Sequence, residues 1–386
     1  MGGPGSSALY NLLALAWIAS LGGAIVATSA FAWIVTFVFA AGAVLLHRGG
    51  KASSAVRDAA LQDVSVASWI AWHLVLAPAC LCAYPVIFLF AGTAVRVGMV
   101  ALAAPYLIWA YLIDDSPTTG TCPSNLRSLP IFAHIARYFP VRLVKTADVP
   151  PDGRYVWCYH PHGVVFWGLL SGIVTQGAGF DALFPGLDLR MMSIDVNTML
   201  PAFREVNKRF GVCKVTWTAC NAVLERGSGS GTLIVPGGAQ EAVVAYPNTM
   251  NLKILRRRGF LKVALRQGAS LVPVLSFGEN DVYRLMHVEE GSLLWNLQCA
   301  LQQMFGFTVP HFWGRTILGV PTIMPLRRDI NIVVGRPIPV AKFDGDLRSP
   351  EGKRVLEELF ATYTRELQSL FEAHKGNYPP CTMTIM

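Results

Sequence analysis

The sequence predicts a membrane-anchored α/β protein, and three observations lead to this fold class. Of the 386 residues, 53% are hydrophobic and 15% are charged, which is more apolar and less charged than an ordinary soluble domain. The apolar residues crowd into the first third of the chain, in long runs without charge. Beyond about residue 116, short β-branched or aromatic runs alternate with stretches of helical spacing, the pattern of an α/β domain.

The first apolar region has no Asp, Glu, Lys or Arg from Met1 to His47. The stretch Leu9 to Leu46 is long enough for one tilted membrane span or a tight pair, and its composition fits both. A cleaved signal usually starts with basic residues, which are missing here, so we expect the segment to be retained as an anchor. Residues 1–63 are therefore predicted to be an N-terminal hydrophobic segment followed by a basic, cytoplasmic loop.

Two further uncharged stretches, Val64 to Val95 and Val97 to Ile113, are separated only by Arg96. A short connection forces the second helix back to the starting side, so residues 64–115 are predicted to form a transmembrane hairpin. Pro, Gly, Ser and Thr then cluster, which marks a border. We expect residues 116–386 to form a cytosolic α/β domain.

The charge balance limits the partners. Lysine and arginine number 32 against 24 aspartates and glutamates, and much of the excess follows residue 140. This favours an anionic partner, either membrane phospholipid or the phosphates of a small molecule. Nucleic acid is disfavoured because no recognisable nucleic-acid module accompanies the charge. The eight cysteines show no C-x-x-C spacing, so we expect reduced thiols and no metal site.

Within the α/β region, four runs have the composition of strands: Tyr155–Tyr159, Gly231–Val235, Ser270–Ser276 and Ile330–Val334. Helical spacing extends over Lys253–Gly268 and over Pro350–His374, with Ser349 as the expected N-cap of the second helix. The uncharged, aromatic-rich segment Leu293–Gly314 fits either a buried helix or an interfacial segment that rests on the bilayer.

The motif His160-Pro161-His162-Gly163 directly follows the first strand and precedes Val164–Val174, which we expect to be a helix. Proline keeps this segment out of a helix, so the two imidazoles are presented on a tight loop. The first amides of the following helix would point at the same place, where an oxyanion could be stabilised. Histidine titrates near operating pH and can remove a proton from an attacking alcohol. Taken alone, the motif also fits a histidine pair without a catalytic role.

The next two strands also end in polar turns. Pro236, Gly237 and Gly238 follow the second strand, and Glu241 is the first carboxylate after that turn. Glu279 and Asn280 follow the third strand, at a sheet edge where open α/β sheets bind ligands. Between these turns lies a basic cluster that could bind phosphates, although a solvated or lipid-facing patch fits its charge equally well: Arg257, Arg258, Gly259, Phe260 and Lys262.

Content and order of these motifs resemble the type-2 diacylglycerol acyltransferase family, which also includes monoacylglycerol and wax-alcohol acyltransferases. The resemblance covers about Tyr106 to Tyr378. It rests on six motifs in family order: Tyr138-Phe139-Pro140, Tyr159 to Gly163, Val235 to Glu241, Arg257 to Phe260, Ser276 to Asn280 and Val334 to Ile338. The Pro-Gly-Gly form with Gln240 is most similar to plant and algal members.

The resemblance implies a glycerolipid-acyltransferase-like domain behind a membrane hairpin, resident in endoplasmic reticulum and lipid droplets. It predicts transfer of an acyl group from acyl-CoA, as co-substrate, to diacylglycerol, forming triacylglycerol without a bound cofactor or metal. Monoacylglycerol, a wax alcohol or phytol are alternative acceptors. A lipid-binding or scaffolding protein without activity is the rival class, disfavoured because both histidines and Glu241 are present.

The resemblance also implies kinship with glycerophosphate acyltransferases that carry H-x-x-x-x-D. Here Val165 takes the aspartate's place, so Glu241 is our candidate to orient a histidine, within hydrogen-bond reach of His160 or His162 or bridged to one of them by one water. We expect His160 to be the base and His162 the oxyanion or positioning group. The other motif residues are predicted to bind substrate: Pro161, Gly163, Pro236, Gly237, Gly238, Arg257, Arg258, Gly259, Phe260, Lys262, Glu279 and Asn280.

Overall fold

The computed structural model describes residues 54–76, 85, 88–121, 125–201, 203–289, 291–293, 295–296, 298, 300 and 310–386. The spans predicted within Leu9 to Leu46 lie outside these residues, as does most of Leu293 to Gly314. The chain divides into two compact units. The N-terminal unit combines Met1–Ser116 with Met199–Val206, and the sheet unit combines Pro117–Thr198 with Asn207–Met386.

The N-terminal unit contains one described helical stretch, Thr93–Thr119, that is long and apolar enough to cross a membrane by length and composition. Arg96 lies inside α5, so the predicted break between two spans at this residue is wrong. The Arg96 guanidinium donates hydrogen bonds to the carbonyl oxygens of Phe88 and Leu89, just before α5, at 2.9 and 2.6 Å. The helices are α3 (Ser54–Ile70), η1 (Ala71–Leu76), α5 (Thr93–Ile108) and η2 (Trp109–Ile113).

A short segment from far along the chain completes the N-terminal unit. Arg204 is 1% exposed, and its guanidinium donates to Asp114 Oδ2 at 2.7 Å and to Glu205 Oε1 at 2.6 Å. The Tyr106 hydroxyl donates to the same Glu205 oxygen at 3.0 Å. The buried charge is thus paired and hydrogen-bonded, as burial of an ion requires.

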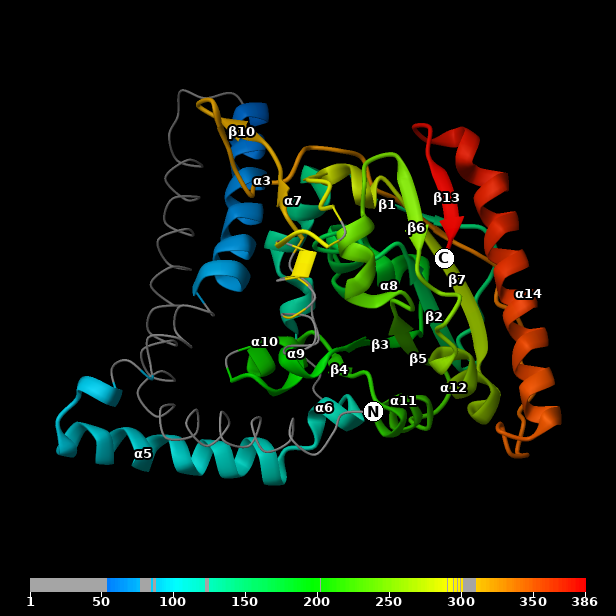
Figure 1. Ribbon diagram of the computed structural model, residues 1–386, viewed down its shortest axis with the longest axis horizontal. Helices are drawn as coiled ribbons and strands as arrows, with labels where there is room; N and C mark the ends of the chain where they lie inside the picture. The colour runs from blue at the N-terminus through cyan, green and yellow to red at the C-terminus, as the bar shows by residue number, and fades with distance from the viewer. Residues whose placement is uncertain are drawn as a thin grey trace. The chain divides into compact units, whose positions relative to one another are not determined.

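The sheet unit is built on a seven-stranded sheet in the order β1-β12-β7-β2-β5-β3-β4. Figure 1 labels β1, β7, β2, β5, β3 and β4 of this sheet. Strands β7, β2, β5, β3 and β4 are parallel, whereas β12 is antiparallel to β7 and parallel to β1. All four predicted strands are present, which confirms the α/β fold class. The bounds are β1 Arg142–Lys145, β2 Tyr155–His160, β3 Asp188–Ser193, β4 Val212–Lys214, β5 Ser230–Ile234, β7 Ser270–Phe277 and β12 Asn331–Val334.

Helices cover both faces of this sheet, which is why all six residues of β2 are buried. Val156 and Cys158 belong to the core that β2 and β7 share with α11 (Trp217–Leu224), α12 (Gly259–Gln267) and α14 (Pro350–His374). Trp157 points to the opposite face, where its ring lies 5.7 Å from that of Phe180. Because side chains alternate along a strand, His160 lies on the α14 face.

The predicted helix α14 is confirmed at both ends, and the Ser349 hydroxyl accepts a hydrogen bond from the Gly352 amide at 3.0 Å. The other predicted helix begins at Gly259, so its expected start at Lys253 is wrong. The preceding residues form β6 (Thr249–Leu252), which pairs in parallel with β13 (Thr382–Ile385). This pairing holds the backbone extended up to Leu252 and delays the helix.

The remaining described elements are short, and they complete the sheet unit: α6 (Ser116–Thr119), η3 (Asn125–Ser128), α7 (Pro130–Tyr138), η4 (Leu169–Val174), α8 (Phe180–Leu183), α9 (Asp195–Met199), α10 (Phe203–Arg209), η5 (Gly238–Val244), η6 (Glu279–Val282), β8 (Arg284–Leu285), β9 (Phe312–Trp313), β10 (Thr316–Ile317), β11 (Val320–Pro321) and η7 (Lys375–Asn377). Residues of α6, α9 and α10 also extend into the N-terminal unit.

Candidate active site

Three turns meet at one edge of the sheet, because β5, β2 and β7 are neighbours and run in parallel. The register sets Cys158 opposite Ile234 and His160 opposite Leu275, so the three strands end at similar heights. The carboxyl ends of these strands carry the histidine motif, the turn with Glu241 and the turn with Glu279. The structure therefore brings the three predicted motifs together.

The histidine loop begins with a cis peptide bond between His160 and Pro161 and continues with Gly163 at φ +66°. A Cβ on Gly163 would lie 2.8 Å from Cγ of Glu279, so glycine is needed for both conformation and space. The helix starts only at Trp167 and continues as the π-helix η4 from Leu169. The helix expected from Val164 is thus shorter than predicted, because a turn occupies its first residues.

Glu279 lies under this loop and is 1% exposed. Its carboxylate accepts hydrogen bonds from the Tyr159 hydroxyl at 2.5 Å, the Ser276 hydroxyl at 3.1 Å and the Gly168 amide at 3.1 Å. Burial raises the pKa of Glu279 to about 7, and these hydrogen bonds oppose the rise. The Gly168 amide therefore binds the protein's own carboxylate, so the expectation that the first helix amides face an oxyanion is wrong here. Glu279 joins the two ends of the loop.

Glu241 is equally buried and contacts the same loop from the β5 turn. Its Oε2 accepts from the backbone N–H of His162 at 2.9 Å, and its Oε1 accepts from the Lys253 amide at 2.8 Å. Glu241 therefore lies within hydrogen-bond reach of His162, as predicted, but among the described hydrogen bonds its direct contact is with the backbone and not with an imidazole. A Cβ on Gly237 would lie 1.8 Å from Oε1, so only glycine leaves room for this carboxylate.

The electrostatics of Glu241 resemble those of Glu279. Burial raises the pKa of Glu241 to about 7, while the two amide hydrogen bonds and the charges of Lys253 and Arg257 act in the opposite direction. The remaining residues of this turn are structural: Pro236 is buried, and Gly238 has φ +63° and donates its N–H to the Val235 carbonyl at 3.0 Å.

The His160 ring is fully buried, and Pro161 beside it is buried too. Its Nε2 lies 2.7 Å from the hydroxyl of Tyr363 on α14. Its Nδ1 has no hydrogen-bond partner in the described part of the protein. Burial lowers the pKa of His160 to about 3, so the ring is neutral at physiological pH.

The His162 ring is only partly buried. Its Nδ1 lies 2.8 Å from the carbonyl oxygen of Gly163. A carbonyl oxygen can only accept a hydrogen bond, so Nδ1 carries the proton of the neutral ring and Nε2 keeps a lone pair. Burial lowers the pKa of His162, and the bond to Gly163 opposes this. The ring packs edge-on against Phe166 at 5.4 Å.

The basic cluster divides into an inward and an outward part. The Arg258 guanidinium donates to both carboxylate oxygens of Glu357 at 3.1 Å and lies 3.4 Å over the Phe360 ring. Phe260 is 4% exposed and packs edge-on against Tyr363 at 5.2 Å. These two residues join α12 to α14, and their role in substrate binding stays a prediction. Arg257, Gly259 and Lys262 are exposed, and the charge of Arg257 reaches Glu241.

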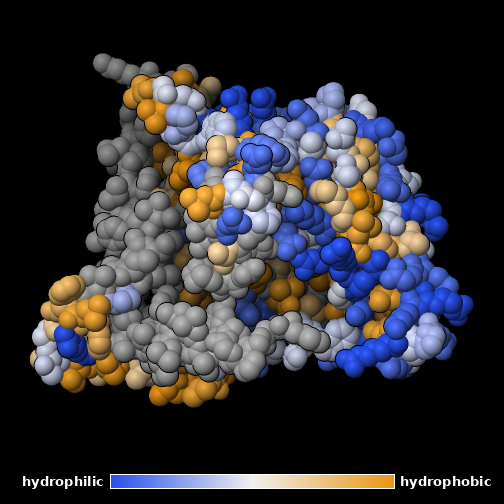
Figure 2. Space-filling model, viewed as in Figure 1, coloured by the Kyte–Doolittle hydropathy of each residue, from blue (hydrophilic) through white to orange (hydrophobic). Residues whose placement is uncertain are grey.

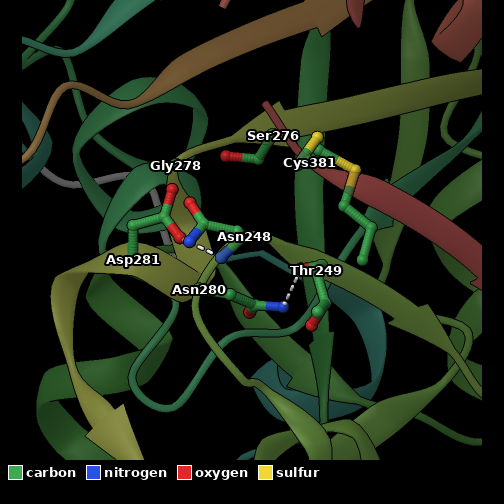
Figure 3. Close-up of a pocket in the computed structure, with 8 residues that line it drawn as sticks. Asn248, Thr249, Ser276, Gly278, Asn280, Asp281 and Cys381 are labelled. Atoms are coloured by element: carbon green, nitrogen blue, oxygen red, sulfur yellow. Dashed lines mark hydrogen bonds between the residues drawn. The ribbon is translucent and has the colours of Figure 1, made fainter. Parts of the chain in front are cut away.

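Asn280 lies in the turn after β7, beside a small pocket between this turn, β6 and Cys381 (Figure 3). It is 5% exposed, and its Nδ2 donates to the Thr249 carbonyl at 2.7 Å. In the same turn, the Asp281 carboxylate accepts from the Asn248 amide at 2.6 Å. Asn280 thus ties the turn to β6, and the pocket is lined by Asn248, Thr249, Met250, Ser276, Gly278, Asn280, Asp281 and Cys381.

Comparison with known proteins decides the family. A family model described as diacylglycerol acyltransferase matches residues 93–385. The chain belongs to the diacylglycerol acyltransferase family. It is 34% identical over 319 residues to diacylglycerol O-acyltransferase 2B of Umbelopsis ramanniana, covering 82% of this chain and 88% of that protein. It is 37% identical over 321 residues to 2-acylglycerol O-acyltransferase 1 of Bos taurus, covering 82% and 92%.

A solved structure was also matched, that of the 1-acyl-sn-glycerophosphate acyltransferase of Thermotoga maritima. The match covers 81% of this acyltransferase and 95% of that chain, at 10% identity and a TM-score of 0.35. This likeness is too low to carry an argument about fold or mechanism.

Sequence reasoning missed one residue of the candidate site, Tyr363. It lies on the buried face of α14 among leucines and phenylalanines such as Leu356, Phe360 and Leu367. The signal that could have found it is its hydroxyl, because a tyrosine within a buried face needs a hydrogen-bond partner for its polar end. In this family member that partner is His160.

Proposed function

We propose that this family member transfers a fatty acyl group from acyl-CoA to the hydroxyl of diacylglycerol and so forms triacylglycerol. The family match and a relative named as a diacylglycerol O-acyltransferase support this acceptor. A relative of similar identity named as a 2-acylglycerol O-acyltransferase makes monoacylglycerol the second candidate. A wax alcohol or phytol would present the same single hydroxyl to the same chemistry.

The observation that carries the mechanism is the hydrogen bond from His162 Nδ1 to the Gly163 carbonyl. It leaves the Nε2 lone pair of a partly exposed ring free to take the proton of the acceptor hydroxyl. The hydroxyl oxygen then attacks the thioester carbon, and the tetrahedral intermediate collapses with loss of the CoA thiolate. The thiolate takes the proton from the imidazolium, which restores the base.

The two histidines thereby exchange the roles expected from sequence. His160 is fully buried, and its low pKa makes it a poor base. Its Nδ1 is the buried ring atom without a protein partner, so we assign this N–H to the thioester oxygen as negative charge develops there. Glu241 acts through the backbone, because its bond to the His162 amide holds the base in place.

Two kinds of exposed surface suit the co-substrate and the membrane. Arg257 and Lys262 are exposed beside the Glu241 turn and suit the phosphates of CoA. In the N-terminal unit, α5 and η2 expose large apolar side chains such as Val97, Leu102 and Leu112, which Figure 2 shows as an apolar surface over α5. This surface supports anchoring in a membrane, and we place the enzyme as a multi-pass protein in the endoplasmic reticulum and on lipid droplets.

The test compares His162→Gln and His160→Gln in membranes of cells that lack their own triacylglycerol synthesis. His162→Gln should lower turnover about a thousandfold, and His160→Gln about a hundredfold. The exposed His287 provides the control, since His287→Gln should keep normal turnover. Supplying diacylglycerol and monoacylglycerol in turn identifies the acceptor.

The outcomes separate the alternatives. Near-normal turnover in His162→Gln together with an inactive His160→Gln would restore the original order of roles. If both variants kept normal turnover, histidine catalysis would be excluded. A product formed only with monoacylglycerol would exclude diacylglycerol as the acceptor.

A further inference from the structure

We propose that Tyr363 of α14 is a positioning residue of this active site, whose hydroxyl fixes the His160 ring in one orientation and one tautomer. The proposal rests on the function proposed above and deepens it, because it names the group that prepares His160 for its role. Tyr363 lies outside every motif that the sequence singled out for chemistry.

The contact between the two residues is direct and fully enclosed. The Tyr363 hydroxyl lies 2.7 Å from His160 Nε2, although the residues are 203 positions apart in the chain. Both side chains are fully buried, so water does not compete for this hydrogen bond. The bond therefore fixes the rotation of the imidazole as well as its position.

The two groups fit either direction of this hydrogen bond, and we assign Tyr363 as the donor. Besides His160 Nε2, the Tyr363 hydroxyl has the Cys158 sulfur within hydrogen-bond reach. Sulfur is a weak acceptor, whereas an unprotonated imidazole nitrogen is a strong one. With Tyr363 as the donor to Nε2, the one proton of the neutral imidazole resides on Nδ1. That N–H is the group left without a protein partner.

Tyr363 is itself held by the motif that was expected to bind phosphate. Arg258 pairs with Glu357 and stacks on Phe360, which precede Tyr363 on α14 at steps of three residues. Phe260 packs against the ring of Tyr363. The inward half of this motif thus fixes the helix that carries Tyr363, which gives a reason for an arginine and a phenylalanine at these positions.

Loss of the hydroxyl should affect the reaction and not the binding of substrate. Without Tyr363 as donor, the Nε2 lone pair is buried and unpaired, so the proton can move to Nε2 and the ring can turn. The Nδ1–H would then be present at the thioester oxygen for only part of the time. The Tyr363 side chain itself touches no reacting atom.

The experiment is Tyr363→Phe in the full-length, membrane-bound enzyme, with Tyr155→Phe as the matched control. Tyr155 is 3% exposed and its hydroxyl donates to the Pro150 carbonyl at 2.6 Å, at the far end of β2 from the histidines. Tyr363→Phe should lower kcat about tenfold to a hundredfold and leave KM for acyl-CoA within about twofold. Tyr155→Phe should keep normal kcat with a similar loss of thermal stability.

A double-variant cycle distinguishes positioning from a general structural role. If Tyr363 acts through His160, adding Tyr363→Phe to His160→Gln should cause no further loss of kcat. The proposal would be overturned if Tyr363→Phe lowered kcat by the same factor in His160→Gln as in the wild type. A wild-type kcat in Tyr363→Phe alone would overturn it too.

A second measurement needs no Tyr363 variant. In protein labelled with ¹⁵N-histidine, the signal that disappears in His160→Gln should show a proton on Nδ1 and none on Nε2. A proton on Nε2 would overturn the proposal even if catalysis depends on both histidines. Conversely, normal activity of His160→Gln and His162→Gln would exclude the proposed mechanism. The tautomer measured for His160 would not change with that result.

Discussion

The turn after β5 and the turn after β7 use the same device at neighbouring strand ends, with different results. Each places a buried glutamate against a glycine without room for a side chain, Gly237 for Glu241 and Gly168 for Glu279. Burial raises both pKa values to about 7. Glu279, however, binds two hydroxyl groups and one amide, whereas Glu241 binds two amides and lies near the exposed Arg257.

Because of this difference, we expect one glutamate to support the shape of the histidine loop and the other to serve its function. Glu279 joins Tyr159, before the histidine motif, to Gly168, after it, and so determines whether the loop keeps its shape. Glu241 holds the amide of one residue, His162, the proposed base. Two carboxylates with equal burial and similar pKa are thus expected to respond differently to the same substitution.

The largest effect should come from removing each carboxylate. Glu279→Leu removes the acceptor of two hydroxyl groups and one amide, whose protons are left unpaired in the core. We expect a loss of about 4 kcal/mol of folding stability, measured by thermal unfolding in detergent at pH 7. Glu241→Leu leaves only two amides unpaired, so it should unfold closer to the wild type and lower turnover about a hundredfold.

An exposed glutamate on α14 supplies the control for this pair, since Glu372→Gln should leave stability and turnover unchanged. Equal losses of stability in Glu241→Leu and Glu279→Leu would contradict the division between support and function.

The pH dependence of stability should be smaller but shared by both glutamates. A pKa raised from 4.5 to about 7 means that the folded state binds a proton which the unfolded state releases. The stability from each group is thus complete below about pH 4.5 and is lost as the pH rises through about 7, by roughly 3 kcal/mol at most. Unfolding measured at pH 5 and pH 8 should show a weaker decline in Glu241→Gln and in Glu279→Gln. An unchanged decline in both variants would mean that other groups cause it.

The smallest effect concerns the side of the site that faces solvent. Arg257→Ala should raise KM for acyl-CoA roughly fivefold with little change in kcat, because an exposed phosphate contact binds ground and transition states alike. Arg258→Ala should instead lower stability, since it breaks the pair with Glu357. Arg354→Ala, at an exposed arginine of α14, is the control for charge. An unchanged KM in Arg257→Ala would remove this residue from the CoA site.

Parts of the fold were predictable where one local signal was strong enough. The central strands are continuous apolar runs because both sheet faces are covered, and α14 combines a capping serine with a regular apolar face. Strand β3 escaped prediction because Asp188 and Arg190 interrupt its apolar pattern, and these two side chains pair with each other. Strand β4 has only three residues, too few to show a period.

The candidate site was predictable as a set of motifs but not as a set of contacts. Parallel strands bring their carboxyl ends together, so the nearness of the histidines to Glu241 followed from chain order. Whether a carboxylate meets a ring or a backbone amide depends on loop geometry, which composition does not reveal. Arg257 and Arg258 illustrate the limit, since two adjacent residues of one type point outward and inward.

The buried pair of Asp114 and Arg204 has a consequence for the order of synthesis. The two residues close the same unit, yet 90 positions separate them, and β3 is made in between. At about 5 to 20 residues per second, Arg204 follows Asp114 out of the ribosome after roughly 5 to 20 seconds. During this time the Asp114 carboxylate, at the end of the apolar helix, cannot form its ion pair with Arg204. The N-terminal unit therefore cannot finish folding before Pro117–Thr198 of the sheet unit has been translated.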